Sequence, residues 1–152
     1  MGIFRPLGFL LLMLLIPPGC SVLWAQDALL NDDPAALIGL NLENLLSRFG
    51  VPRTVYAARG HEEWQDDVVF VYEEADFYVY KDRVWQISLK AAYGIRLGDP
   101  RSAVILTLGE EAEDFEDHIL LVLPSKGWPL TFRVNVNGSG FISALFVYRS
   151  DF

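Results

Sequence analysis

The chain has 152 residues, and its 12 Lys and Arg against 20 Asp and Glu give a formal net charge of −8 at pH 7. This length predicts one domain, and the acidity argues against binding to nucleic acid or to anionic lipid headgroups, both of which attract basic surfaces. Cys20 is the only cysteine, which excludes an intramolecular disulfide and any metal site built from several cysteines.

Residues 1–25 predict an export signal. Arg5 supplies a positive start, and Leu7–Ile16 is a largely apolar run. The run is too short to span a bilayer, which takes about 20 residues, and it fits the hydrophobic region of a signal peptide. Two processing sites compete: cleavage after Ala25 releases a soluble chain, and cleavage before Cys20 leaves a lipid-anchored one. We therefore expect an exported protein, periplasmic or secreted, with a lipid anchor at Cys20 as the alternative.

Residues 26–36 predict a linker, with a helix start at Asp33-Pro34, and residues 37–152 predict a single domain. The domain begins with a short helix that Asn41 caps and Gly50 ends. The helix is too short to be stable in isolation, so its apolar stripe must lie on a sheet. The stripe consists of Leu42, Leu45, Leu46 and Phe49.

A second short helix follows the same pattern. Asp99 is its expected cap, Pro100 lies in its first turn, and Gly109 ends it. Its apolar stripe consists of Ala103, Val104, Ile105 and Leu108. Gly39 and Gly50 are spaced as Gly98 and Gly109 are, at a period of 59 residues. We therefore predict two tandem repeats, residues 37–92 and 93–152.

Strands are expected after each helix, since runs rich in Val, Ile, Tyr and Phe alternate with turn residues. In the first half they are Arg53–Arg59, Val68–Tyr72, Phe77–Tyr80 and Val84–Leu89. In the second half they are Ile119–Leu123, Leu130–Val136 and Phe141–Tyr148, preceded by an acidic loop over Glu110–Asp117. Sequential strands usually pair with their neighbours. The prediction is an α+β fold: an antiparallel sheet from two helix-plus-strands repeats, with the short helices on one face.

The first half, about residues 37–89, resembles the SmpA/OmlA group, which contains the BamE outer-membrane assembly lipoproteins. The likeness rests on a capped helix ending in Gly50-Val51-Pro52, on the strand Asp67–Tyr72, and on the closing run Asp82–Ile87. The second half matches mainly at Tyr93–Gly109. The tandem arrangement is similar to the β-lactamase inhibitor protein fold, in which two such repeats form one curved sheet. The resemblance implies binding through a surface and no chemistry.

Reactive side chains form no recognisable catalytic or metal-binding pattern. His61 stands beside several carboxylates and His118 follows Glu116 and Asp117, but neither group has the spacing of a calcium loop or of a zinc site. The serines lie in no nucleophile elbow, and no phosphate-binding loop is present. We expect no catalytic, cofactor-binding or metal-binding residues, no cofactor, and no enzymatic activity.

Aromatic side chains give the better indication of function. If Trp85, Ile87 and Leu89 face the helices, Tyr78 and Tyr80 point to the open face of the sheet, where tyrosine offers rigid amphipathic area for binding. The same tyrosines could instead stabilise neighbouring strands. The predicted partner-binding residues are Tyr78, Tyr80, Trp64 and Trp128. Trp64 and Trp128 both lie beside turns, where a tryptophan could instead fill its loop. We expect an exported binding or envelope-assembly module whose partner is another envelope or secreted protein. The alternative is a secreted enzyme inhibitor using an acidic loop, and an uncharacterised hydrolase is a weaker one.

Overall fold

The computed structural model describes residues 33–59 and 66–151. The helical segments in this part of the chain are η1 (Pro34–Leu37), α2 (Leu42–Phe49), α3 (Arg101–Leu108) and η3 (Gly109–Glu111). The strands are β1 (Thr54–Ala58), β2 (Asp67–Val71), β3 (Ala75–Tyr80), β4 (Arg83–Leu89), β5 (Ala91–Ala92), β6 (Ile95–Arg96), β7 (Glu113–Asp114), β8 (His118–Leu123), β9 (Leu130–Val136) and β10 (Ile142–Arg149).

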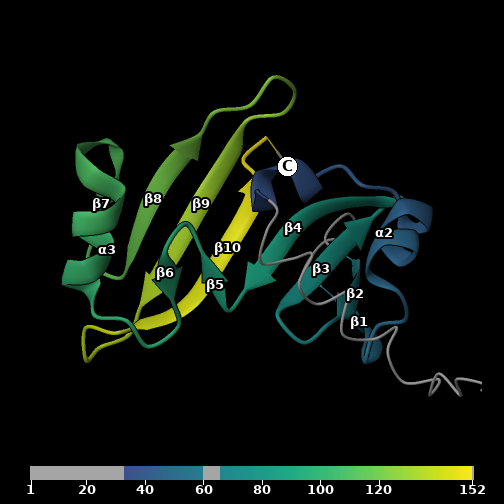
Figure 1. The fold of residues 1–152 in the computed structure, drawn as a ribbon, viewed down its shortest axis with the longest axis horizontal. Coiled ribbons are helices and arrows are strands. Elements are labelled where there is room, and N and C mark those ends of the chain that lie inside the picture. The colour runs from purple at the N-terminus through teal and green to yellow at the C-terminus, as the bar shows by residue number, and fades with distance from the viewer. Residues whose placement is uncertain (1–32, 60–65, 152) are drawn as a thin grey trace, which may run out of the picture.

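Eight strands form one sheet in the order β1-β2-β3-β4-β10-β9-β8-β7, and each neighbouring pair is antiparallel. The first meander thus consists of β1 to β4, which come directly after α2, and the second consists of β7 to β10, which come after α3 (Figure 1). The two meanders meet where the last strand of each, β4 and β10, pair with each other. The predicted α+β class and antiparallel sheet are confirmed.

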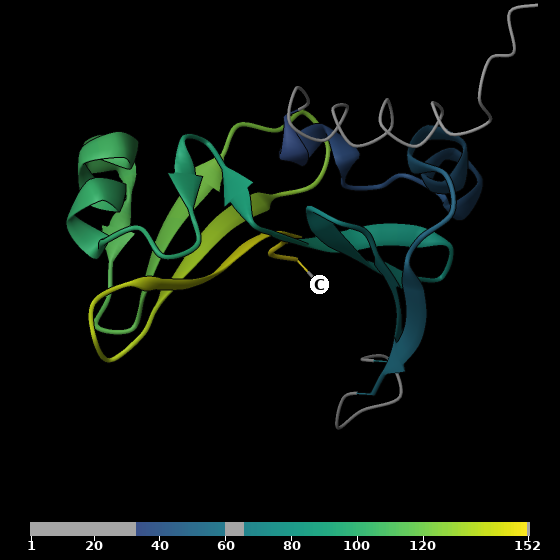
Figure 2. The same ribbon diagram turned by 60° about the horizontal axis from the view of Figure 1, so that its bottom comes forward.

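The helical elements cover one side of the sheet. Figure 2 shows η1, α2, α3 and the small β5–β6 hairpin on the same side, over the convex surface of an arched sheet. The opposite side is concave, and no described helix lies across it. This side is the open face considered below.

A single apolar core joins the sheet to the helices. Phe77, Ile87, Val147 and Phe132 are cross-strand neighbours on β3, β4, β10 and β9, and each is fully buried. Leu45 of α2 and Val104 of α3 belong to the same core and are also fully buried. The core therefore runs continuously beneath both helices. The predicted linker boundary at residue 36 falls inside η1, whose Pro34 and Leu37 are buried.

Helix α2 begins and ends at the predicted residues. The Asn41 side chain accepts a hydrogen bond from the Asn44 backbone N–H at 2.9 Å, and Gly50 ends the helix with φ of 73°. Its apolar stripe is narrower than predicted: Leu45 and Phe49 are buried, whereas Leu46 is 38% exposed. The prediction that Leu46 packs in the core was wrong. In this two-turn helix, the side chains of Leu45 and Phe49 point directly at the sheet, and that of Leu46 lies at the edge of the contact.

Helix α3 begins without the predicted cap. Its first residue is Arg101, and Pro100 before it makes no capping side-chain bond. Asp99 instead accepts a hydrogen bond from the Arg96 backbone N–H at 2.8 Å, so its carboxylate closes the turn before the helix. The prediction of Asp99 as the cap was wrong. Gly109 ends the helix with φ of 73°, as predicted.

Strand β4 contains an irregularity that reverses part of the predicted facing pattern. Tyr78 pairs with Gln86 but Val79 pairs with Val84, so Trp85 is an extra residue in a β-bulge. Val84 and Ile87 are fully buried against the helices, and Trp85 and Gln86 both lie on the open face. The expectation that Trp85 faces the helices was wrong, because a bulge breaks the two-residue alternation on which it rested.

Other strand boundaries agree with the sequence to within about two residues, and β9 matches the predicted bounds. The acidic stretch predicted as a loop contains η3 and the two-residue strand β7. The β5–β6 hairpin is an element that the sequence analysis did not identify.

Candidate functional site

Two rows of side chains run across the open face, each defined by the strand register. One row contains Tyr56, Val69, Tyr78, Gln86, Tyr148 and Thr131 from β1, β2, β3, β4, β10 and β9. The next row contains Asp76, Ser88, Phe146 and Arg133 from β3, β4, β10 and β9. Most of these side chains are half-buried. The face thus combines aromatic, amide and charged groups on a rigid strand scaffold.

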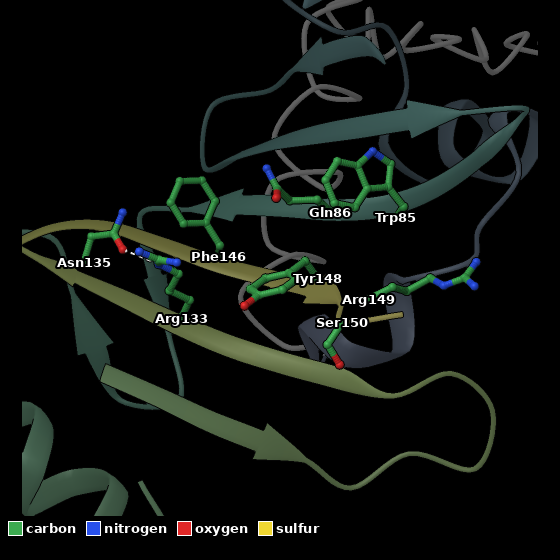
Figure 3. Close-up of a pocket in the computed structure, with 8 residues that line it drawn as sticks. All are labelled: Trp85, Gln86, Arg133, Asn135, Phe146, Tyr148, Arg149 and Ser150. Carbon is green, nitrogen blue, oxygen red and sulfur yellow. Dashed lines mark hydrogen bonds between the residues drawn. The ribbon is translucent and has the colours of Figure 1, made fainter. Parts of the chain in front are cut away.

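A depression of about 480 Å³ lies on this face at the junction of the two meanders. Figure 3 shows the side chains that line it, which are Trp85, Gln86, Arg133, Asn135, Phe146, Tyr148, Arg149 and Ser150. The depression therefore draws on β4 of the first meander and on β9 and β10 of the second. Its lining contains aromatic rings, hydrogen-bonding amides and guanidinium groups, which is a composition common in protein-binding surfaces.

Trp85 is held in place by a buried carboxylate. Its indole Nε1–H donates a hydrogen bond to Asp67 Oδ1 at 2.8 Å, and Asp67 is 7% exposed. Burial raises the pKa of Asp67, the bond from Trp85 opposes that rise, and the nearby Asp66 adds to it. The indole is thereby fixed at the edge of the depression, so that its ring orientation does not have to be established on binding.

Tyr78 lies in a carboxylate-rich and aromatic part of the open face. Burial raises its pKa to about 12, with further contributions from Tyr56, Asp76 and Asp67. The phenol is therefore neutral at physiological pH and presents a hydroxyl that can donate or accept a hydrogen bond. Asp76 also has a raised pKa, chiefly from burial and opposed by Lys90.

Three of the four predicted binding residues are described by the structure, and they lie in two different settings. Tyr78 and Tyr80 lie on the open face, and Tyr80 is half-buried beside the Lys81 ammonium group. Trp128 lies elsewhere, on the helix-covered side, where it packs against Gly39. The Arg149 guanidinium lies over its ring, with the Arg149 Cζ atom 4.6 Å from the ring centroid. Trp64 falls outside the described residues, as does most of the His61–Asp67 segment.

Arg133, Phe146 and Gln86 are site residues that the sequence analysis did not select. The clean alternation in Leu130–Val136 already placed Arg133 on the side away from the core. Its neighbours come from β10 and β4, however, and the pairing of these two strands joins segments more than 50 residues apart in the chain. No local pattern in the sequence indicates that pairing.

A second hollow, of about 620 Å³, lies where α2 meets the edge strand β1. It is mainly apolar and is lined in part by Leu46, Val51, Val55 and Phe70. Within the described residues, no three His, Cys, Asp or Glu side chains gather as metal ligands would. No helix in the same part of the chain is both long enough and apolar enough to cross a bilayer.

These features define an α+β domain whose eight-stranded antiparallel sheet has one covered and one open face. Comparison with protein-family models gives no match, and comparison with curated proteins gives none. Among solved structures, the chain is similar to an extracellular protein containing an SCP domain from Bacillus anthracis str. Ames, with a TM-score of 0.51 and 14% sequence identity. The match covers 79% of this chain and 46% of that protein, so this chain spans less than half of its length. At this identity the likeness concerns the fold.

Proposed function

We propose that this protein is an exported, non-enzymatic binding module that contacts another envelope or secreted protein through its open sheet face. The observation that carries the proposal is the concave surface that the described helices leave uncovered. It contains a depression lined by Trp85, Phe146 and Tyr148 together with amide and guanidinium groups. Aromatic and Arg side chains supply most of the binding energy in typical protein interfaces.

Export is the part of the proposal that rests on the N-terminal sequence. A positive residue followed by a short apolar run and small residues is the pattern of a secretory signal, with Cys20 as the alternative lipid-anchored start. The similar solved structure is described as an extracellular protein, which agrees with export. Mass determination of the N-terminus in a purified native sample would separate the two processing sites.

Two copies of one unit, joined through their last strands, form the scaffold in this proposal. Gly39 and Gly98, 59 residues apart, have φ of 88° and 86°. The Gly39 N–H donates to the Val84 carbonyl at 2.8 Å, and the Gly98 N–H donates to the Ile142 carbonyl at 3.0 Å. The following residue in each half accepts the return bond, at 2.9 Å in both.

The same backbone bonding therefore precedes each helix and ties it to the last strand of its own meander. This correspondence supports the tandem-repeat arrangement. It also agrees with the proposed resemblance to the SmpA/OmlA group and to the tandem repeats of the β-lactamase inhibitor protein fold.

The test is capture of a partner from an envelope extract of the source organism. We expect Tyr78→Ala with Tyr80→Ala to lose a protein that the unaltered chain retains, since both side chains lie on the open face. Leu106→Ala is the matched control, because Leu106 is 85% exposed and belongs to α3, a helix that lies on the covered side of the sheet. If capture is unchanged in the tyrosine variant and lost in the control, the partner binds the helix-covered side, and the proposal is refuted.

A second candidate is a secreted inhibitor that inserts an acidic loop into an enzyme, and one observation favours it. The loop after α3 is held in a fixed shape by Arg101, whose guanidinium pairs with Asp114 and donates to the backbone carbonyls of Phe115 and Glu116, the latter at 2.7 Å. A segment that is already ordered costs less entropy to insert. Inhibition that survives Glu113→Gln with Glu116→Gln would count against this candidate.

A further inference from the structure

The Arg133 side chain forms no ion pair with a described residue, whereas several other arginines of this acidic protein do. Arg53 pairs with Glu73, Arg101 with Asp114, and Arg149 with Asp151. Among residues 33–59 and 66–151, no carboxylate oxygen lies within 4 Å of the Arg133 guanidinium. Acidic residues outnumber basic ones by 20 to 12 in this chain, so a half-buried arginine without an acidic partner calls for an explanation.

The guanidinium is nevertheless fixed in orientation. Arg133 Nε–H donates a hydrogen bond to the Asn135 side-chain oxygen at 2.7 Å, which occupies one edge of the group (Figure 3). The two terminal nitrogens remain, and together they form the planar fork that matches the two oxygens of a carboxylate. Because the fork is already oriented, little side-chain entropy is lost when it binds.

The surroundings of Arg133 favour an anion that reaches it from the open face. Arg133 lines the depression, and its cross-strand neighbours in the register are Phe146 on β10 and Leu120 on β8. Half-buried apolar neighbours reduce screening by water and strengthen a charge pair formed there. Asp117 interacts electrostatically with Arg133, but the pKa of Asp117 is lowered mainly by its hydrogen bond with His118 and only in small part by Arg133.

Carboxylates lie on both sides of Arg133 in this row, because the register continues from Arg133 through Leu120 to Glu113 of β7. Asp76 occupies the same register row as Arg133, with β4 and β10 between their strands, which corresponds to about 14 Å at the usual strand spacing. Arg149 also lines the depression, but it pairs with Asp151 at 3.1 Å and Figure 3 shows its side chain extending away from Arg133. Arg133 is thus the positive residue of this described row, with Asp76 three strands away on one side and Glu113 two strands away on the other.

We propose that the depression around Arg133 binds an aspartate or glutamate side chain presented by the protein partner of the open face. The carboxylate forms a two-point hydrogen bond with the terminal nitrogens of Arg133. Gln86 and Tyr148, which line the same depression, are placed to hydrogen-bond the backbone that carries the acidic residue. This inference rests on the proposed function and names the chemistry by which that function recognises its partner.

A peptide of six glutamates is a suitable probe, because a protein of net charge −8 repels it except where a local cation attracts it. In a titration followed by NMR at low salt, we expect the Arg133 Nε–Hε resonance to shift saturably. Arg133→Gln should weaken binding by at least about tenfold, and Arg133→Lys should weaken it less because it keeps the charge but loses the fork. Asp76→Asn is the matched control on the same row and should bind within about twofold of the unaltered protein or more tightly.

Three outcomes would overturn the proposal: no shift of the Arg133 resonance, equal affinity in Arg133→Gln, or an equal shift caused by a peptide of six lysines. The shift experiment uses the unaltered protein and therefore remains decisive if a variant does not fold. The partner-capture assay then separates the two proposals. Capture that is lost with the Tyr78 and Tyr80 changes but kept with Arg133→Gln would preserve the proposed function and remove the carboxylate assignment. Capture kept by both variants would remove both.

Discussion

Gly39 and Gly98 provide a matched pair of positions for testing how Trp128 contributes to stability. Both have a left-handed backbone, with φ of 88° and 86°, and both donate a backbone hydrogen bond to the final strand of their meander. They differ in what surrounds them. A Cβ added at Gly39 would lie 2.1 Å from a ring carbon of Trp128, whereas a Cβ at Gly98 would meet nothing within 4 Å.

We expect Gly98→Ala to lower the free energy of unfolding by about 1–2 kcal/mol, which is the usual cost of a left-handed conformation for a residue with a Cβ. Gly39→Ala carries the same cost and must also displace Trp128. The indole is 40% exposed, so its displacement removes part of a large buried area, roughly 100 Å² or more at about 25 cal/mol per Å². The expected loss for Gly39→Ala is therefore about 3–5 kcal/mol.

Urea unfolding of the two variants, followed by circular dichroism, measures the difference. We expect Gly39→Ala to lose about 2–3 kcal/mol more than Gly98→Ala, at similar denaturant slopes. In a Trp128→Ala background this extra loss should disappear, since the contact that causes it is gone. Equal losses for the two glycine variants in the unaltered background would refute the argument that Trp128 packs against Gly39 as a structural wedge.

Three further results are expected. Phe132→Ala should lower the free energy of unfolding by about 3–5 kcal/mol in chemical denaturation because its side chain is fully buried, whereas Leu46→Ala, at 38% exposed, should cost under about 1 kcal/mol; similar losses would contradict the assigned core. Asp67→Asn keeps the acceptor for Trp85 and removes a buried charge. Folding raises the pKa of Asp67, so its ionised form destabilises the folded state at neutral pH. Asp67→Asn should therefore have a higher free energy of unfolding than the unaltered protein at pH 7. This difference in stability should vanish as the pH falls and Asp67 of the unaltered protein becomes protonated. Spectrophotometric titration should find Tyr78 ionising near pH 12, and Tyr56→Phe should lower that value, since Tyr56 helps to raise it; an unchanged titration would contradict the placement of the two rings together.

Local signals in the sequence were sufficient for most secondary structure. Asn41 and Gly50 mark the ends of α2 because a capping side chain and a left-handed terminator act within a few residues of each other. The alternation from Leu130 to Val136 is likewise complete within one strand, so both its bounds and the outward facing of Arg133 follow from it. These features depend on short-range chemistry, which a single sequence records.

Features that depend on distant partners could not be predicted. The bulge at Trp85 exists only relative to β3, whose register leaves one extra residue on β4. The importance of Arg133 depends on which acidic residues come near it after folding, and counting charges along the chain does not show that. The contact of Trp128 with Gly39 links segments that lie about 90 residues apart, and no local pattern around the tryptophan indicates it.

The shape of the open face follows from the way the two meanders meet. Pairing β4 with β10 places the central seam of the sheet at the last strand of each half, so side chains from both halves adjoin there. The bulge in β4 lies in its pairing with β3, next to this seam, and turns two successive residues, Trp85 and Gln86, toward the same side. This irregularity thus places Trp85 beside Gln86 in the lining of the depression. Deletion of Trp85 should restore regular alternation in β4 and remove the indole from the depression, while Val84 and Ile87 stay buried on the helix side. A crystal structure of the variant tests this, and a β4 that keeps two successive residues on the open face would contradict it.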